Sequence, residues 1–262
     1  MPTAGPEFFD AMTHPTLDGR WLGGKPGLTF DALREYLDSG QLAGACAVAL
    51  PGIGGYAHQQ YFDAASTIPG LIAVAALTTL EPVALNTELD QVAGIGFRAV
   101  KIHPRLLKQH PSGGELGAVL RAIHARGLAA MYCSYYFEPV GQMPGEDPYW
   151  QLVRALNEVP DISLIIAHGG GVRLLEYAEL VRFSPRLLLD VSLTIMKYRG
   201  SSIDSDLAFL FRSFDRRVCV GTDIPDWPFE DVQRVIAEAT STLSAEKSAN
   251  ILHVNIEQFF GL

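Results

Sequence analysis

Eight short apolar runs recur along the chain at nearly even intervals, and this regularity constrains the fold more than any other feature. The first and last runs begin at residues 8 and 217, so the spacing averages about 30 residues, the length of a strand followed by a helix. Each run is almost continuously hydrophobic, as expected for parallel strands covered on both faces. We predict strands at 8–14, 43–50, 71–77, 97–103, 128–134, 163–169, 187–193 and 217–223.

Helical patterns fill the gaps between these runs. Thr29 is a candidate N-cap for a helix that starts at Phe30, and Asp147 followed by Pro148 is a second helix start. Further helices are predicted at 113–126, 172–182, 204–214, 229–240 and 245–260. Eight strand–helix units without a dividing linker predict an α/β fold, a single (β/α)8 TIM barrel that fills one domain over residues 1–262. A doubly wound open sheet has the same periodicity and stays open as the alternative.

Composition narrows the functional classes. The 262 residues carry a net charge of −9, which argues against nucleic acid or an anionic membrane surface as the main partner. An anionic small-molecule substrate stays compatible, because a pocket can be locally basic, and so does a homo-oligomer. Three cysteines that are far apart give no disulfide framework, and neither a signal peptide nor a membrane-length apolar run is found. We therefore expect a cytoplasmic protein.

Polar residues at the ends of the predicted strands indicate where the chemistry lies. His14 ends the first run, Lys101 and His103 end the fourth, His168 ends the sixth and Asp223 ends the eighth. Barrel active sites lie at the carboxyl ends of the strands, so these side chains should converge. Histidine and aspartate are suited to acid–base catalysis near neutral pH and to binding zinc or another divalent metal. The pattern indicates hydrolysis of an amide, ester or lactone. The other four histidines are expected at solvated positions in loops or helices.

Five segments together resemble a known family. They are FDAMTHP, GFRAVKIHP, LIIAHGGG, RVCVGTDIP and NILHVNIEQFFGL, in this order along the chain. The chain resembles the amidohydrolase superfamily, specifically the amidohydrolase-related branch that includes pyrone dicarboxylate lactonases and aminocarboxymuconate semialdehyde decarboxylases. The resemblance covers most of the chain. It implies a barrel enzyme, a hydrolase or decarboxylase, with a metal site in many members.

Two departures from the family pattern affect the metal site. The first histidine of the opening H-x-H falls on Met12, and the histidine at the end of the fifth strand falls on Cys133. The matching positions leave His14, His168 and Asp223, which could hold zinc if the thiolate of Cys133 joined them. Alternatively, Cys133 is a small buried hydrophobic residue and the metal is absent. Lys101 is interpreted as a cation for substrate or for Asp223, because a two-metal centre bridged by a carboxylated lysine also needs the missing histidine.

The sequence as a whole predicts a hydrolase of a small carboxylated lactone, ester or amide. Asp223, His168, His14 and His103 are the predicted catalytic residues. Lys101, Arg105 and Arg173 are the predicted substrate-binding cations, because guanidinium and ammonium groups near the strand ends suit a carboxylate. A metal-dependent decarboxylase of the same branch, and a binding barrel that has lost its activity, are the alternatives.

Overall fold

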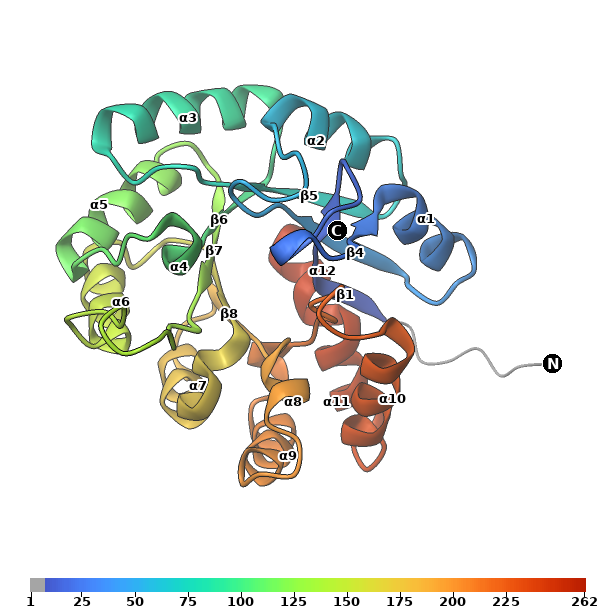
Figure 1. Ribbon diagram of the computed structural model, residues 1–262. Coiled ribbons are helices and arrows are strands. Elements are labelled where there is room, and N and C mark those ends of the chain that lie inside the picture. Colours follow the sequence, from blue (N-terminus) through green and yellow to red (C-terminus); the bar gives the residue numbers. More distant parts are fainter. Residues whose placement is uncertain (1–7) are drawn as a thin grey trace.

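The barrel predicted from the eight runs is present in the computed structural model, which describes residues 8–262 (Figure 1). Eight parallel strands follow one another in chain order around one sheet. They are β1 (Phe9–Thr13), β4 (Gly44–Val48), β5 (Leu71–Ala76), β6 (Ala99–Ile102), β7 (Ala129–Cys133), β8 (Leu164–Ala167), β9 (Leu187–Asp190) and β10 (Val218–Cys219). Each lies within a run predicted from the sequence.

Backbone hydrogen bonds join the first strand to the last and close the sheet. The amide of Ala11 donates to the carbonyl of Val220 at 3.0 Å, and the amide of Asp223 donates to the carbonyl of Met12 at 2.8 Å. A further bridge pairs Thr13 with Ile224 in parallel. The ring of strands excludes the doubly wound open sheet, and the (β/α)8 prediction is confirmed.

Helices lie around the ring of strands, and the last of them lies across one end of it (Figure 1). They are α1 (Phe30–Asp38), α2 (His58–Ser66), α3 (Pro82–Ile95), α4 (Pro104–Leu107), α5 (Gly113–His124), α6 (Pro148–Glu158), α7 (Leu174–Arg182), α8 (Thr194–Lys197), α9 (Ile203–Ser213), α10 (Phe229–Thr240), α11 (Ala245–Ala249) and α12 (Asn255–Phe260). A short pair of strands, β2 (Pro15–Thr16) and β3 (Leu28–Thr29), brackets the loop after β1.

Side-chain caps start two helices where the sequence predicts them. The hydroxyl of Thr29 accepts the amide of Ala32 at 3.1 Å, and the carboxylate of Asp147 accepts the amide of Tyr149 at 2.9 Å. No helix in the described part of the chain combines the length and hydrophobicity needed to cross a membrane.

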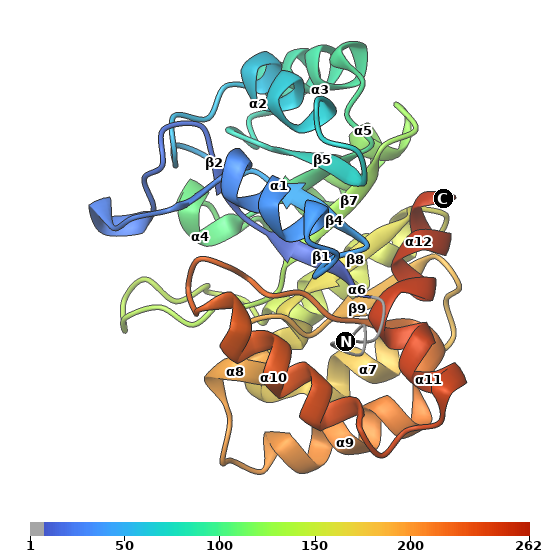
Figure 2. The same cartoon turned by 90° about the vertical axis from the view of Figure 1, so that its right-hand side faces the viewer.

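Two hydrophobic clusters hold the fold together. The larger one lies between strands and helices, and the smaller one fills the barrel interior with side chains such as Val48, Val74 and Met131. Ile256 and Phe260 of α12 belong to the interior cluster and close the barrel at the amino ends of the strands. Figure 2 shows α12 at one end of the barrel and the long loops after β1 and β7 at the other. Only the carboxyl end is therefore left for a site.

Candidate active site

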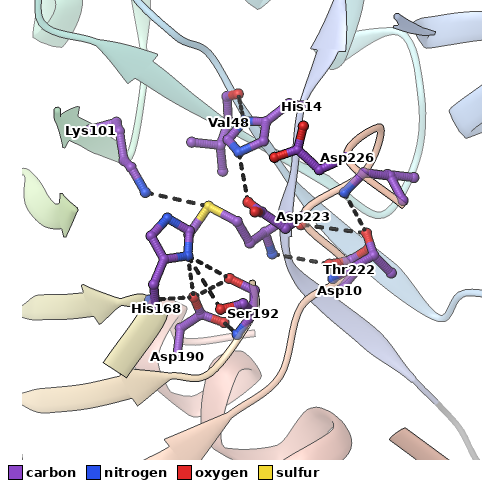
Figure 3. A network of polar contacts seen from close by, with 12 residues as sticks. Asp10, His14, Val48, Lys101, His168, Asp190, Ser192, Thr222, Asp223 and Asp226 are labelled. Atoms are coloured by element: carbon purple, nitrogen blue, oxygen red, sulfur yellow. Dashed lines mark hydrogen bonds and ion pairs between the residues drawn. The ribbon is translucent and has the colours of Figure 1, made fainter. Parts of the chain in front are cut away.

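Five of the predicted residues come together at the carboxyl end of the barrel. Figure 3 shows Lys101, His168 and Asp223 pointing toward one another from different walls. All five side chains are buried, at 6 % exposure or less: His14, Lys101, His103, His168 and Asp223. Buried ionisable groups are rare in a protein interior without partners, so their concentration at one place indicates a functional site.

The backbone is strained at two of these positions. His168 follows β8 with φ of 68°, and Asp223 follows β10 with φ of 55°. Residues other than glycine seldom adopt this left-handed conformation, which costs of order 1–3 kcal/mol. At both positions the residue follows the end of its strand, and its side chain lies at the barrel mouth.

His14 and Asp223 form a pair across the seam of the barrel. Nδ1 of His14 lies 2.7 Å from the carbonyl oxygen of Val48, and Nε2 lies 3.2 Å from Oδ1 of Asp223. A carbonyl oxygen only accepts, so Nδ1 carries a proton, and Nε2 is the ring nitrogen that faces the carboxylate of Asp223. Trp21 stacks on the His14 ring at 5.3 Å, and its indole N–H donates to Asp226 at 2.8 Å, which closes the site from the outside.

A second chain of hydrogen bonds orients His168. Nδ1 of His168 lies 3.1 Å from the hydroxyl of Ser192, which donates to Oδ2 of Asp190 at 2.5 Å. Nδ1 therefore donates to Ser192, and Nε2 faces the barrel mouth; the His168 side chain also hydrogen-bonds Cys133. The amide of His168 also donates to Asp190, at 3.2 Å. Burial raises the pKa of the Asp190 carboxyl, against the hydrogen bonds from Ser192.

Asp223 is ionised despite its burial. Burial opposes ionisation, but the charge of His168, the hydrogen bond and charge of His14, and the charge of Lys101 together hold the pKa of Asp223 well below its ordinary range. Its Oδ1 is taken by His14. The carboxylate therefore brings a permanent negative charge to the barrel mouth.

Lys101 and Cys133 face the same space from adjacent strands. Nζ of Lys101 lies 3.5 Å from the sulfur of Met12. Burial lowers the pKa of Lys101. Burial opposes ionisation of Cys133 as well, but the charge and hydrogen bonding of His168 and the charges of Lys101 and Arg105 outweigh it and lower the thiol pKa to about 6.

Arg105 and His103 lie at the rim after β6. Nε of Arg105 donates to the carbonyl of Tyr135 at 2.8 Å, and the guanidinium lies 4.8 Å from the centre of that ring. Lys197 lies 5.4 Å from the same ring. Burial and then the charges of Lys101 and Arg105 lower the pKa of His103 well below its ordinary value, so its imidazole is neutral.

Arg173 is engaged elsewhere. Its guanidinium pairs with Asp147 at 2.6 Å and with Glu176, and it lies 5.4 Å from the ring of Tyr149. Two carboxylates already balance its charge, so it is a weaker candidate for a substrate carboxylate than Arg105.

Comparison with known proteins agrees with this geometry. The sequence matches the amidohydrolase family over residues 19–262, which is most of the chain. The chain belongs to the amidohydrolase family. The match confirms the family predicted from the five motifs and, with it, the expectation of a hydrolase-type enzyme. No curated protein matches the sequence.

Solved structures share the fold of this amidohydrolase at low sequence identity. An uncharacterised TIM-barrel protein from Bordetella bronchiseptica superposes with a TM-score of 0.80 at 15 % identity, over 97 % of this chain and 98 % of that one. Dihydroorotase from Campylobacter jejuni gives 0.63 at 12 % identity, over 98 % and 83 %. A 5-carboxyvanillate decarboxylase from Novosphingobium aromaticivorans, solved with manganese, gives 0.61 at 14 % identity, over 90 % and 82 %. These likenesses support the fold and leave the substrate open.

The family implies a divalent metal, but the side chains of this amidohydrolase are poorly arranged to hold one. Among residues 8–262, no three His, Cys, Asp or Glu side chains are arranged to hold an ion together. The predicted zinc set of His14, His168, Asp223 and Cys133 is therefore not assembled. Nδ1 of His14 faces the carbonyl of Val48, its Nε2 and Oδ1 of Asp223 bond each other, and the thioether of Met12, a poor ligand for a hard ion, contacts the amine of Lys101. These residues do not fit a divalent centre.

Several residues at the site were not anticipated from the sequence. The carboxylate of Asp10 accepts three hydrogen bonds: from the amide of Thr222 at 2.8 Å, from the hydroxyl of Thr222 at 2.6 Å and from the amide of Met12 at 3.0 Å. These bonds join the first and last strands at the seam of the barrel. Asp190, Ser192 and Trp21 were also missed. An acid inside an apolar run, as in FFDA and LLLDV, is a signal that would have found both aspartates.

Three of the four histidines placed outside the site are not solvated as expected. His124 is exposed, but the side chains of His58, His110 and His253 are only 11 %, 20 % and 19 % exposed, and each lies beside a glutamate. Nε2 of His58 lies 3.1 Å from Glu88, and Nδ1 lies 2.6 Å from the hydroxyl of Tyr56. The expectation failed for His58 because its partner Glu88 lies on α3, which was not delimited from the sequence.

Proposed function

We propose that this amidohydrolase hydrolyses a small lactone, ester or amide that carries a carboxylate, and that it does so without a divalent metal centre. The observation that carries the proposal is the buried pair of His14 and Asp223, 3.2 Å apart at the seam of the barrel. It leaves an ionised carboxylate at the mouth with one oxygen oriented by an imidazole.

The carboxylate can direct a water molecule at the substrate. Oδ1 of Asp223 is held by His14, so Oδ2 is the oxygen available to accept a proton from water as the water oxygen bonds to the carbonyl carbon. The carbonyl π pair moves to oxygen and then returns as the bond to the leaving oxygen or nitrogen breaks. His168, oriented by Ser192, can carry the proton from Asp223 to that leaving atom through Nε2. The products are an acid and an alcohol or amine, and the protein returns to its starting state.

A carboxylate on the substrate has a suitable partner at the rim. Arg105 uses Nε for the carbonyl of Tyr135, which leaves its terminal N–H groups for an anion. Tyr135, Tyr136 and Phe137 pack ring against ring beside it, with centroids 4.5 to 5.5 Å apart. A cation next to aromatic faces favours a flat, anionic molecule of modest size.

The test is a hydrolysis screen on purified protein treated with chelator. Lactones, esters and amides are offered in pairs with and without a carboxylate, and acid release and CO2 release are both recorded. We expect acid release from carboxylated members, with kcat lowered by about 10²-fold or more in Asp223→Asn. Asp38→Asn, at an exposed position on α1, is the matched control and should retain full activity.

Three outcomes would contradict the proposal. CO2 release without hydrolysis would establish a decarboxylase, and saturable binding without turnover would establish a binding barrel. Full activity in Asp223→Asn would remove the proposed base.

A further inference from the structure

The amine of Lys101 is fully buried and has a single, weak hydrogen-bond acceptor among the described residues. Its side chain is 0 % exposed, and its single hydrogen bond to a described residue reaches the sulfur of Met12 at 3.5 Å. A thioether is a weak acceptor, and an ammonium group has three donors. At least two N–H groups of Lys101 therefore lack a partner in the described part of the chain.

This arrangement is costly unless a ligand completes it. An unpaired polar group in the interior destabilises the folded protein, and an unpaired charge does so more strongly. The buried carboxylates nearby have hydrogen-bond donors. Asp10 and Asp190 each accept from backbone and hydroxyl groups, and Asp223 accepts from His14. Lys101 is the exception within an otherwise well-bonded cluster, which points to a bound oxygen atom as its partner.

The position of the amine suits an oxygen atom of the reacting group. Lys101 lies on β6 next to β7, and Figure 3 shows its amine directed toward the space where His168 and Asp223 also point. Burial lowers the pKa of Lys101, and the negative charges of Cys133, Asp190 and Asp223 around it oppose that shift.

We propose that the ammonium group of Lys101 binds the carbonyl oxygen of the substrate and stabilises the oxyanion that forms on it. This rests on the proposed hydrolase function and assigns its electrophilic group. The chain thereby supplies, from a side chain, the positive charge that a metal ion would otherwise provide. A divalent ion at the same place would meet a fixed like charge, which agrees with the poor fit of the site to a metal.

Removing the charge should lower activity without lowering stability. Lys101→Met replaces the amine with an unbranched apolar side chain that is one atom shorter and that can pack beside the sulfur of Met12. We expect kcat to fall by about 10²- to 10³-fold, the range for loss of one oxyanion donor, with KM little changed. The urea midpoint should stay the same or rise, because a buried charge with a weak partner is replaced by an apolar group. A lysine with a purely structural role would instead lower the midpoint.

Binding of a tetrahedral anion tests the site independently of turnover. Methylphosphonate is titrated calorimetrically into chelator-treated wild type, Lys101→Met and Lys25→Met, the last at an exposed loop position. We expect saturable binding to wild type and Lys25→Met, and at least about tenfold weaker binding to Lys101→Met. Metal content after dialysis against zinc or manganese should be far below one ion per chain.

The outcomes separate the two proposals. Absence of hydrolysis in the screen with Lys101-dependent anion binding would refute the proposed function and leave the oxyanion site standing. Equal methylphosphonate affinity in wild type and Lys101→Met, no binding to wild type, or one tightly held metal ion per chain would overturn the assignment of Lys101.

Discussion

Asp10 offers a quantitative test of the electrostatics beneath the site. Burial raises its pKa to about 7, against the hydrogen bonds from Thr222 and Met12. In the unfolded chain the same carboxyl has its ordinary pKa of 3.8. The folded protein therefore binds a proton on Asp10 that the unfolded chain releases. Its contribution to stability is complete below about pH 4 and is lost as the pH rises to about 7.

The size of this effect follows from the shift. About three pKa units at 1.36 kcal/mol each amount to about 4 kcal/mol of unfolding free energy. Asparagine imitates protonated Asp10, because its oxygen can accept the amides of Met12 and Thr222 while its N–H donates to the hydroxyl of Thr222. The variant Asp10→Asn should therefore gain stability relative to wild type as the pH rises.

Urea denaturation at several pH values from about 4 to 8 measures this difference directly. We expect the free-energy difference between Asp10→Asn and wild type to grow by about 4 kcal/mol across that range, mostly between about pH 4 and pH 7. Asp38→Asn, on the exposed face of α1, should show no comparable change. A difference that stays constant with pH would show that Asp10 is ionised in the folded protein, and the reasoning would be refuted.

Three further predictions address the barrel mouth. Because neighbouring cations hold the pKa of Asp223 well below its ordinary range, kcat/KM in chelator-treated enzyme should show no inflection from this residue between about pH 5 and pH 8; an inflection that Asp223→Asn removes would contradict this. Gly170→Ala should lower the unfolding free energy by about 2–4 kcal/mol, because φ is 72° at this position and a Cβ would overlap the Tyr177 ring. An unchanged urea midpoint would contradict this and would show that α7, which carries Tyr177, shifts to make room. Mass-spectrometric mapping of slow alkylation near pH 7 should find Cys133 modified before Cys46 and Cys219, because burial raises the thiol pKa values of those two well above 9.0. Equal labelling of the three would mean that Cys133 is a protonated thiol.

The fold was predictable because one periodic signal repeats eight times. Continuous apolar runs mark strands covered on both faces, and the residues that end them, such as His14 and Asp223, are polar because they face the barrel mouth. Closure of the sheet was not predictable, because it depends on hydrogen bonds between Ala11 and Val220, which are 209 residues apart.

The partners at the site could not be predicted, for the same physical reason. Trp21 reaches Asp226 across 205 residues, and Arg173 is neutralised by Asp147 from the loop before α6. Nothing local in either segment specifies the pairing. The sequence therefore indicates which side chains face the site, and the tertiary structure decides whether their charges are available.

Met12 and Lys101 show how two such positions explain each other. In the sequence, Met12 stands where the family's metal-binding pattern has a histidine, and nothing more can be said of it. In the structure its sulfur contacts the ammonium group of Lys101 at 3.5 Å, and a soft, flexible thioether tolerates that group without capturing it as a carboxylate would. A strong ion pair would consume the donors that the substrate oxygen needs. Met12 in place of a metal ligand and the buried Lys101 are therefore two parts of one arrangement. In it, the positive charge is the ammonium group of Lys101 and not a metal ion.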